Sequence, residues 1–203
     1  VTRYADPDTA YRPFSKDAAG FALGEAAAVL ILEELGHALR RDANIYGEIV
    51  GCGSSSDAYH VMDFSPDLQQ ASVAVGRALK DANLTPGEIE YINAHGTAIP
   101  SHDVGETAIV KKVFGERAYS IPISTTKPYT GHVLGASGGV GLIACALMMQ
   151  RGFLHPTLNF TGSYPQCDLD YIPNDGYLKK VNTILLTSFG FGGYNSACIL
   201  KSY

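Results

Sequence analysis

The sequence has no cluster of lysine and arginine residues, and its formal net charge is −5 at pH 7. Proteins that bind nucleic acids usually carry a basic patch, so we expect no nucleic-acid partner. The longest apolar stretch, residues 140–149, is too short to span a bilayer, and no signal peptide opens the chain. We therefore expect a cytoplasmic protein without a membrane partner.

Cysteine pairs with the spacing of metal ligands are also missing. The four cysteines lie far apart in the sequence, and none belongs to a C-x-x-C motif, which argues against a zinc site. We expect no metal and interpret all four thiols as reduced, structural side chains. They are Cys52, Cys145, Cys167 and Cys198.

The chain does contain enough apolar residues for one sizeable core, since 46% of its 203 residues are hydrophobic. Strand-like and helix-like segments alternate, which predicts an α/β fold with a mixed, mainly parallel sheet and helices on both faces. The nearly continuous apolar run from Ala26 to Leu32 is typical of a strand buried on both faces. Residues 1–20 are predicted to be irregular, further strands lie within 45–57, 89–96, 121–124, 183–188 and 197–200, and helices within 35–42, 66–83, 86–90, 104–114 and 138–151.

Two histidines beside glycines mark a candidate site. His95 lies in NAHGT after a predicted strand, and His132 lies in TTKPYTGH before a predicted helix. Glycine allows a tight turn, and α/β proteins place their chemistry at strand ends and helix N-termini. A single histidine is more often structural than catalytic. Two of them in glycine-bracketed turns, with Lys127 between them and Glu106 nearby, favour a polar active site.

Five motifs in order make the pattern specific. They are GFALGEAAAVLILEE, AHGT followed by Asp103 and Glu106, TTKPYTGHVLGASGG, CDLDYIP and SFGFGGYN. In this order they resemble the C-terminal half of elongating β-ketoacyl-acyl-carrier-protein synthases. That family has the thiolase fold, in which two similar halves form five αβαβα layers. The resemblance implies that residues 1–203 are the second half, and Val1 in place of methionine is consistent with a fragment, a processed chain or half of a larger protein.

The resemblance also implies a reaction, the decarboxylative Claisen condensation of acyl and malonyl thioesters. The family's nucleophilic cysteine lies in the first half, so we expect this chain to act only with an N-terminal half that carries it. His95 and His132 match the two histidines that donate to the developing enolate oxygen. Lys127 matches a lysine that pairs with a carboxylate resembling Glu106, and this pair would orient the histidines.

The loop SFGFGGYN is expected to control entry of the acyl chain and to bind the acyl oxygen. Phe191 matches the family's gating phenylalanine, and the neighbouring glycines would let a backbone N–H point at the acyl oxygen. The acyl gate and oxyanion loop is therefore assigned to Gly190, Phe191 and Gly192.

The substrate arm is expected to meet altered residues. Thr97 matches a threonine that binds the phosphopantetheine arm of acyl carrier protein, and no other cofactor is implied. The family's second threonine is replaced by Ile99, and Met62 stands where relatives often carry another hydroxyl. Three explanations of these departures stay open: an unusual carrier protein, an unusual acyl chain or a non-catalytic role.

The expected partners are acyl carrier protein and an N-terminal ketosynthase half or a full ketosynthase partner, in a dimeric assembly. The pathway, fatty acid or polyketide biosynthesis, stays open. One alternative is a non-catalytic partner like the chain-length-determining subunits, which usually lose the histidines that this chain keeps. The other is half of a thiolase, but the GFGG loop and the two-histidine pattern favour the synthase.

Overall fold

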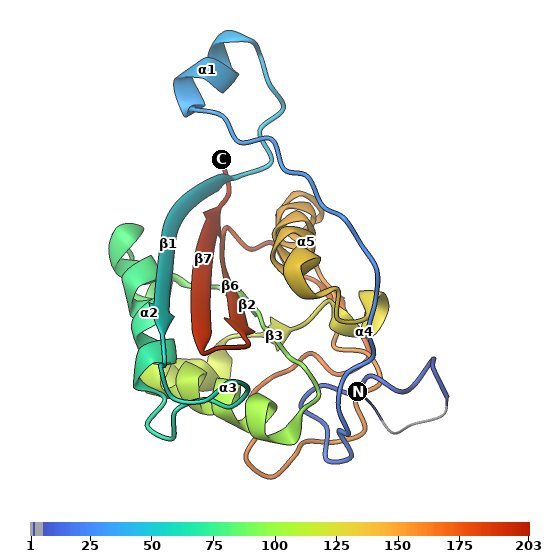
Figure 1. Cartoon of the computed structure of the whole chain (residues 1–203). Coiled ribbons are helices and arrows are strands. Elements are labelled where there is room, and N and C mark those ends of the chain that lie inside the picture. Colours follow the sequence, from blue (N-terminus) through green and yellow to red (C-terminus); the bar gives the residue numbers. More distant parts are fainter. Residues whose placement is uncertain (1, 3–5) are drawn as a thin grey trace.

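The computed structural model describes residues 2 and 6–203, and the other residues of the predicted irregular start, 1 and 3–5, lie outside the described part. Its main feature is a five-stranded sheet with the strand order β1-β7-β6-β2-β3 (Figure 1). The strands are β1 (Glu48–Ser56), β2 (Tyr91–Asn93), β3 (Ile123–Ser124), β6 (Thr183–Gly190) and β7 (Tyr194–Lys201). A second sheet pairs β4 (Phe153–Leu154) with β5 (Tyr177–Leu178).

The sheet is mixed, as predicted, but it is not mainly parallel, because two of its four strand pairs are antiparallel and these two are the longer ones. β2 pairs in parallel with both β6 and β3, whereas β7 pairs antiparallel with β6 and with β1. β6 and β7 are joined by a short turn, a connection that only antiparallel strands can use. The parallel pair β2–β3 instead needs a crossover, which carries helix α3 (Pro100–Phe114).

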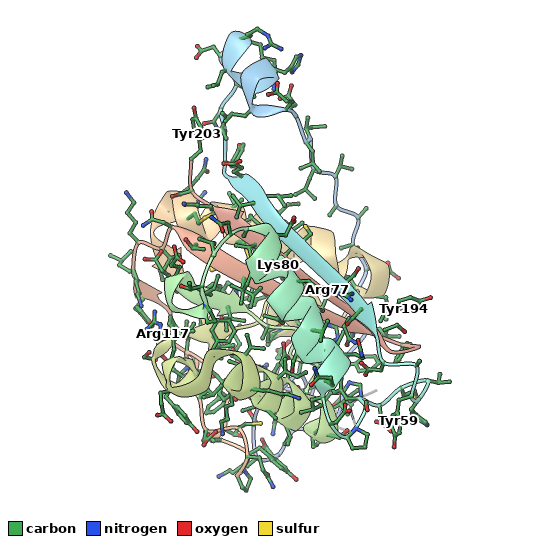
Figure 2. All side chains as sticks on the ribbon, turned by 90° about the vertical axis from the view of Figure 1, so that its left-hand side faces the viewer. Tyr59, Arg77, Lys80, Arg117, Tyr194 and Tyr203 are labelled. Atoms are coloured by element: carbon green, nitrogen blue, oxygen red, sulfur yellow. The ribbon has the colours of Figure 1, made fainter. Side chains whose placement is uncertain are left out.

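Helices cover both faces of this sheet, which confirms the predicted layers. α2 (Gln69–Asp81) and α3 lie on one side, and α5 (Ser137–Arg151) lies on the other (Figure 1). Figure 2 labels Arg77 and Lys80 on α2, and the Arg77 guanidinium donates to the backbone oxygen of Ser54 on β1. The shorter helices are α1 (Leu35–Arg40), α4 (Lys127–Thr130), η1 (Pro86–Glu88), η2 (Gly115–Ser120) and η3 (Leu134–Ala136). No helix within residues 2 and 6–203 has the length and apolar character that crossing a membrane requires.

Two glycines in β1 allow α2 to pack closely on the sheet. A Cβ atom on Gly51 would lie 2.4 Å from the backbone oxygen of Ala78, and one on Gly53 would lie 2.0 Å from that of Ala74. Side chains alternate along a strand, so these two glycines face α2 and the residue between them faces away from it.

The strand predicted from Ala26 to Leu32 is not formed, and this prediction is wrong for the described chain. The segment runs alongside α5 (Figure 1), where a Cβ on Gly139 would lie 2.8 Å from the Ala28 Cβ. Its outward side chains stay open to solvent, with Val29 80% and Ile31 79% exposed. A strand needs a neighbour to bond its backbone, and no strand among the described residues pairs with this segment.

Candidate active site

The turn that carries His95 is held by a buried carboxylate from α3. The backbone N–H groups of His95 and Gly96 donate to Glu106 Oε1 and Oε2, each at 2.8 Å. The hydroxyl of Thr187 on β6 donates to Glu106 Oε1, also at 2.8 Å. Gly96 has a φ of +48°, a conformation that glycine adopts without strain. Glu106 thus fixes the end of β2 against α3 and β6.

A second buried carboxylate, Asp103, fixes the rest of the turn, and sequence reasoning assigned it no role. Its Oδ1 accepts from the backbone N–H groups of Thr97 at 3.1 Å and Ala98 at 3.2 Å, and its Oδ2 accepts from Phe14 at 2.7 Å. Burial raises the pKa of Asp103 to about 8. The sequence signal that could have revealed this role is the D-x-x-E spacing of Asp103 and Glu106, because residues three apart lie on the same face of a helix.

Lys127 begins α4 and lies buried beside His95. Its Nζ donates to the backbone oxygen of His95 and lies 3.4 Å from His95 Nδ1. Burial lowers the pKa of Lys127 to about 8, although Glu106 opposes this effect. The predicted direct pair of Lys127 and Glu106 needs correction, because it is not among the ion pairs within 4.0 Å in the described part. Both Glu106 oxygens already accept from other donors, so the two residues orient His95 separately.

His132 lies opposite His95 across a short gap, with ring centroids 5.5 Å apart and planes at 83°. Its Nδ1 accepts from the backbone N–H of Leu134 at 3.1 Å and lies 3.2 Å from Ser137 Oγ. A backbone N–H can only donate, so the proton of the neutral imidazole is on Nε2. The structure therefore brings the two predicted histidines together and fixes the tautomer of His132.

Both imidazoles are neutral at pH 7. Burial, and then the positive charge of Lys127, lowers the pKa of His132 to about 4. The same two causes hold the pKa of His95 well below its ordinary value. As an ammonium group, Lys127 directs its protons at His95 Nδ1, which then accepts and leaves the proton on Nε2. The site thus holds two neutral N–H donors.

The two histidines line a cavity of about 400 Å³. Other residues that line it are Met62, Thr97, Ile99, His102 and Phe191. The hydroxyl of Thr97 is buried in this wall and has no hydrogen-bond partner among the described residues. A buried polar atom without a partner is costly unless a ligand or water satisfies it. The described residues that line the cavity include no cysteine.

The predicted gate loop forms the turn between β6 and β7. Phe191 lines the cavity and is 51% exposed, and Gly190 is the last residue of β6. Gly192 adopts a φ of +83°, but its backbone N–H donates to the oxygen of Val61 at 2.7 Å. The part of the oxyanion prediction that concerns Gly192 is therefore wrong, because this N–H is directed at the neighbouring loop.

That neighbouring loop follows β1 and is tied to the turn at a second point. The backbone N–H of Asp57 donates to the oxygen of Gly193 at 2.9 Å, and the side chain of Asn195 donates to Asp57 Oδ1 at 2.7 Å. Figure 2 shows Tyr59 and Tyr194, one from each segment, at the same corner of the molecule. The two segments thus form one rim of the cavity.

Replacing Lys127 by alanine should raise the pKa of both site histidines, because a nearby positive charge disfavours a protonated imidazole. The pKa of His132 should move from about 4 toward its ordinary value of 6.5. Proton NMR titration of the imidazole ring signals measures this shift. Lys112→Ala is the matched control, because Lys112 lies on the surface and bonds to Asp67 and Gln69. An unchanged His132 titration in Lys127→Ala would mean that burial alone sets its pKa.

Comparison with known proteins gives a consistent picture. A family profile described as "Beta-ketoacyl synthase, C-terminal domain" matches residues 46–161, more than half of the chain. The chain is 46% identical to a 3-oxoacyl-[acyl-carrier-protein] synthase 2 of Synechocystis, over 99% of its own length and 48% of the relative's. It is 44% identical to the tetracenomycin polyketide synthase ketoacyl synthase alpha subunit of Streptomyces glaucescens, over 96% of its length and 46% of the relative's.

A solved structure gives the same result. This chain superposes with a TM-score of 0.96 and 37% identity on a chain in a complex of a type II polyketide synthase acyl-carrier protein with its ketosynthase, bound to the hexaketide. The match covers 99% of this chain and 49% of that chain. The chain thus spans about half the length of the curated relatives it matches.

Proposed function

The chain belongs to the β-ketoacyl synthase family, and from this premise we propose that it carries the decarboxylating half of a condensing active site. The whole enzyme would be an acyltransferase that joins acyl and malonyl thioesters held on acyl carrier protein. Its product would enter fatty acid or polyketide biosynthesis. The relatives carry names from both pathways, so the family alone does not choose between them.

The observation that carries this proposal is the pair of neutral histidines facing each other across the cavity. When malonyl thioester loses carbon dioxide, the electron pair of the broken C–C bond passes to an enolate. Negative charge then develops on the thioester oxygen, and Nε2–H groups of His95 and His132 can donate to it. The enolate carbon attacks the acyl group held as a thioester on the nucleophilic cysteine, and that cysteine leaves as thiolate. Burial, and then the positive charge of Lys127, lowers the pKa of both imidazoles, so each stays neutral and donates through a single N–H.

The acyl group needs a nucleophile from another polypeptide segment, since no described residue lining the cavity is a cysteine. We propose that an N-terminal ketosynthase portion supplies it, in this or a separate chain, within a dimeric assembly. A chain-length-determining role is disfavoured because both histidines are present and positioned. A cytoplasmic location stays a prediction from the sequence.

A surface for this partner is the apolar strap, which we define as residues 26–34. It lies in no strand, and the backbone of residues 26–33 makes no hydrogen bond to other described backbone groups, whereas Glu34 caps α1. Val29, Ile31 and Leu32 are 71–80% exposed, whereas Ala28 faces α5. Unpaired backbone N–H and C=O groups beside outward apolar side chains are suited to pairing with added strands. The continuous apolar sequence that predicted a doubly buried strand is explained if the partner's sheet receives the strap.

Charges on the strap should block this assembly. In the double variant Val29→Lys and Ile31→Lys, two solvent-facing side chains change, so the fold of the chain itself should be preserved. Binding to the N-terminal portion of a related ketosynthase, measured by surface plasmon resonance, should weaken at least about tenfold, because a buried lysine must lose its hydration. Leu178→Lys is the control, at a position 82% exposed on β5. Equal binding by the double variant would show that the strap lies outside the interface.

The substrate arm is proposed to enter the cavity along Thr97. The partnerless hydroxyl in its wall supports a polar ligand, and a phosphopantetheine arm offers amide groups to it. Ile99 and Met62 also line this wall, so the arm would meet a more apolar surface than the family pattern provides. The carrier of this arm would be acyl carrier protein, with no separate cofactor.

The test of the proposed function is carbon dioxide release from malonyl-acyl carrier protein by the chain assembled with an N-terminal ketosynthase portion. We expect release by the assembly and none by either part alone. An assembly that forms, yet leaves malonyl-carrier protein intact, would refute the proposed reaction.

A further inference from the structure

Two thiols lie face to face on neighbouring strands, away from the active-site cavity. Cys52 of β1 is the direct register partner of Cys198 of β7, and their Sγ atoms are 3.4 Å apart. Both are free thiols in the structure, and Cys52 is exposed. Neither belongs to the constellation of histidines and carboxylates described above.

The backbone places these side chains on the same face of the sheet. Gly51 and Gly53 face α2, so Cys52 points to the opposite face, where Cys198 packs beside the apolar cluster under α5. The glycines on both sides of Cys52 therefore serve helix packing within a regular strand and do not form a turn.

The register also matches disulfide geometry. The backbone N–H of Cys52 donates to Asp81 Oδ2 at 2.9 Å, so it points away from β7. Cys52 and Cys198 thus form a non-hydrogen-bonded antiparallel pair, in which Cα atoms are about 4.5 Å apart and side chains approach most closely. Disulfides occur at Cα separations of about 4.4–6.8 Å, so a bond can close with little backbone movement.

We propose that Cys52 and Cys198 are a modification site that a peroxide oxidises to a cross-strand disulfide. Cys52, the exposed thiol, attacks one oxygen of hydrogen peroxide, breaks the O–O bond and becomes a sulfenic acid, releasing one water. The sulfur of Cys198 then attacks this sulfenic sulfur, and the hydroxyl leaves with the Cys198 proton as a second water. Two thiols lose two electrons, and one peroxide gains them.

The surroundings assign different parts to the two thiols. Burial, and then the neighbouring Cys52, raises the pKa of Cys198 to about 12, so Cys198 is a poor first nucleophile. It lies within reach of the sulfenic acid once that forms and acts as the resolving thiol. The bond would fasten the edge strand β1 to β7, the strand that leads from the gate turn. Thiol reductants would reverse it.

The experiment is peptide mapping of the 203-residue chain after treatment with hydrogen peroxide. Under non-reducing conditions we expect one peptide pair joined through Cys52 and Cys198, with a mass lower by about 2 Da than the two reduced peptides. Dithiothreitol should separate the pair. Cys145→Ala is the matched control, since Cys145 is buried near Cys198 and its loss should leave the bridge unchanged.

Cys52→Ser should abolish the bridge, and thermal melting should check that this variant is folded. If Cys52→Ser does not fold, the peptide map of the wild-type chain still decides whether the bridge between Cys52 and Cys198 forms. A bridge between Cys198 and Cys145, or a sulfinic or sulfonic acid on Cys52 without any bridge, would overturn the proposal. So would two intact thiols after a treatment that oxidises the exposed Met62 of the same chain.

Discussion

Replacing His95 or His132 by alanine in the assembled enzyme should lower carbon dioxide release from malonyl-carrier protein by about 10²–10³-fold, the usual effect of losing one donor to a developing oxyanion. Each histidine places a neutral Nε2–H at the cavity, and the two rings are 5.5 Å apart, so both can reach one thioester oxygen. The measurement is the initial rate at saturating substrate, where a loss in kcat reports an interaction made in the transition state.

The control for this prediction is His37→Ala, which removes an exposed histidine on α1 and should leave the rate unchanged. Glutamine at either site gives a finer test, because its amide keeps one N–H donor and should recover part of the rate. Either alanine variant working at the wild-type rate would contradict the assigned role of that histidine.

Replacing Glu106 by alanine should have the largest effect on stability. Three donors would lose their acceptor, namely the backbone N–H groups of His95 and Gly96 and the hydroxyl of Thr187. Each buried donor left without a partner costs about 1–3 kcal/mol, so we expect the free energy of unfolding to fall by about 3 kcal/mol or more. That is a large share of the roughly 5–15 kcal/mol typical of a folded domain. Urea unfolding followed by circular dichroism measures the change.

Glu106→Gln separates the loss of acceptors from the loss of volume. Glutamine fills the same space and keeps one acceptor oxygen, so its stability should lie between the wild-type and alanine values. Glu116→Ala is the matched control on the exposed turn η2 and should stay within about 0.5 kcal/mol of wild type. If Glu106→Ala has the wild-type free energy of unfolding, the turn that carries His95 is held by other contacts.

The positions of the site histidines and most secondary structure were predictable because they depend on local patterns. NAHGT and TGH bracket the histidines with glycine, and α2 and α3 follow from apolar spacing. The α3 helix begins at Pro100, four residues before the predicted start, because proline suits the first helical position. The prediction missed the first turn because its residues are polar and show no apolar spacing. The turn at Phe191 was predictable for the same reason, since its glycines mark the turn directly, and its role as a gate stays a prediction.

The sequence by itself determined which residues are candidates for the chemistry, because that information lies in residue type and close spacing. Only the tertiary structure decided what those residues contact. Glu106 binds backbone N–H groups where a pair with Lys127 was predicted, and a sequence pattern contains no information on which backbone groups are left unpaired. The strap lies unpaired, and Cys52 meets Cys198 across 146 residues, because strand pairing depends on neighbours that are distant in the chain.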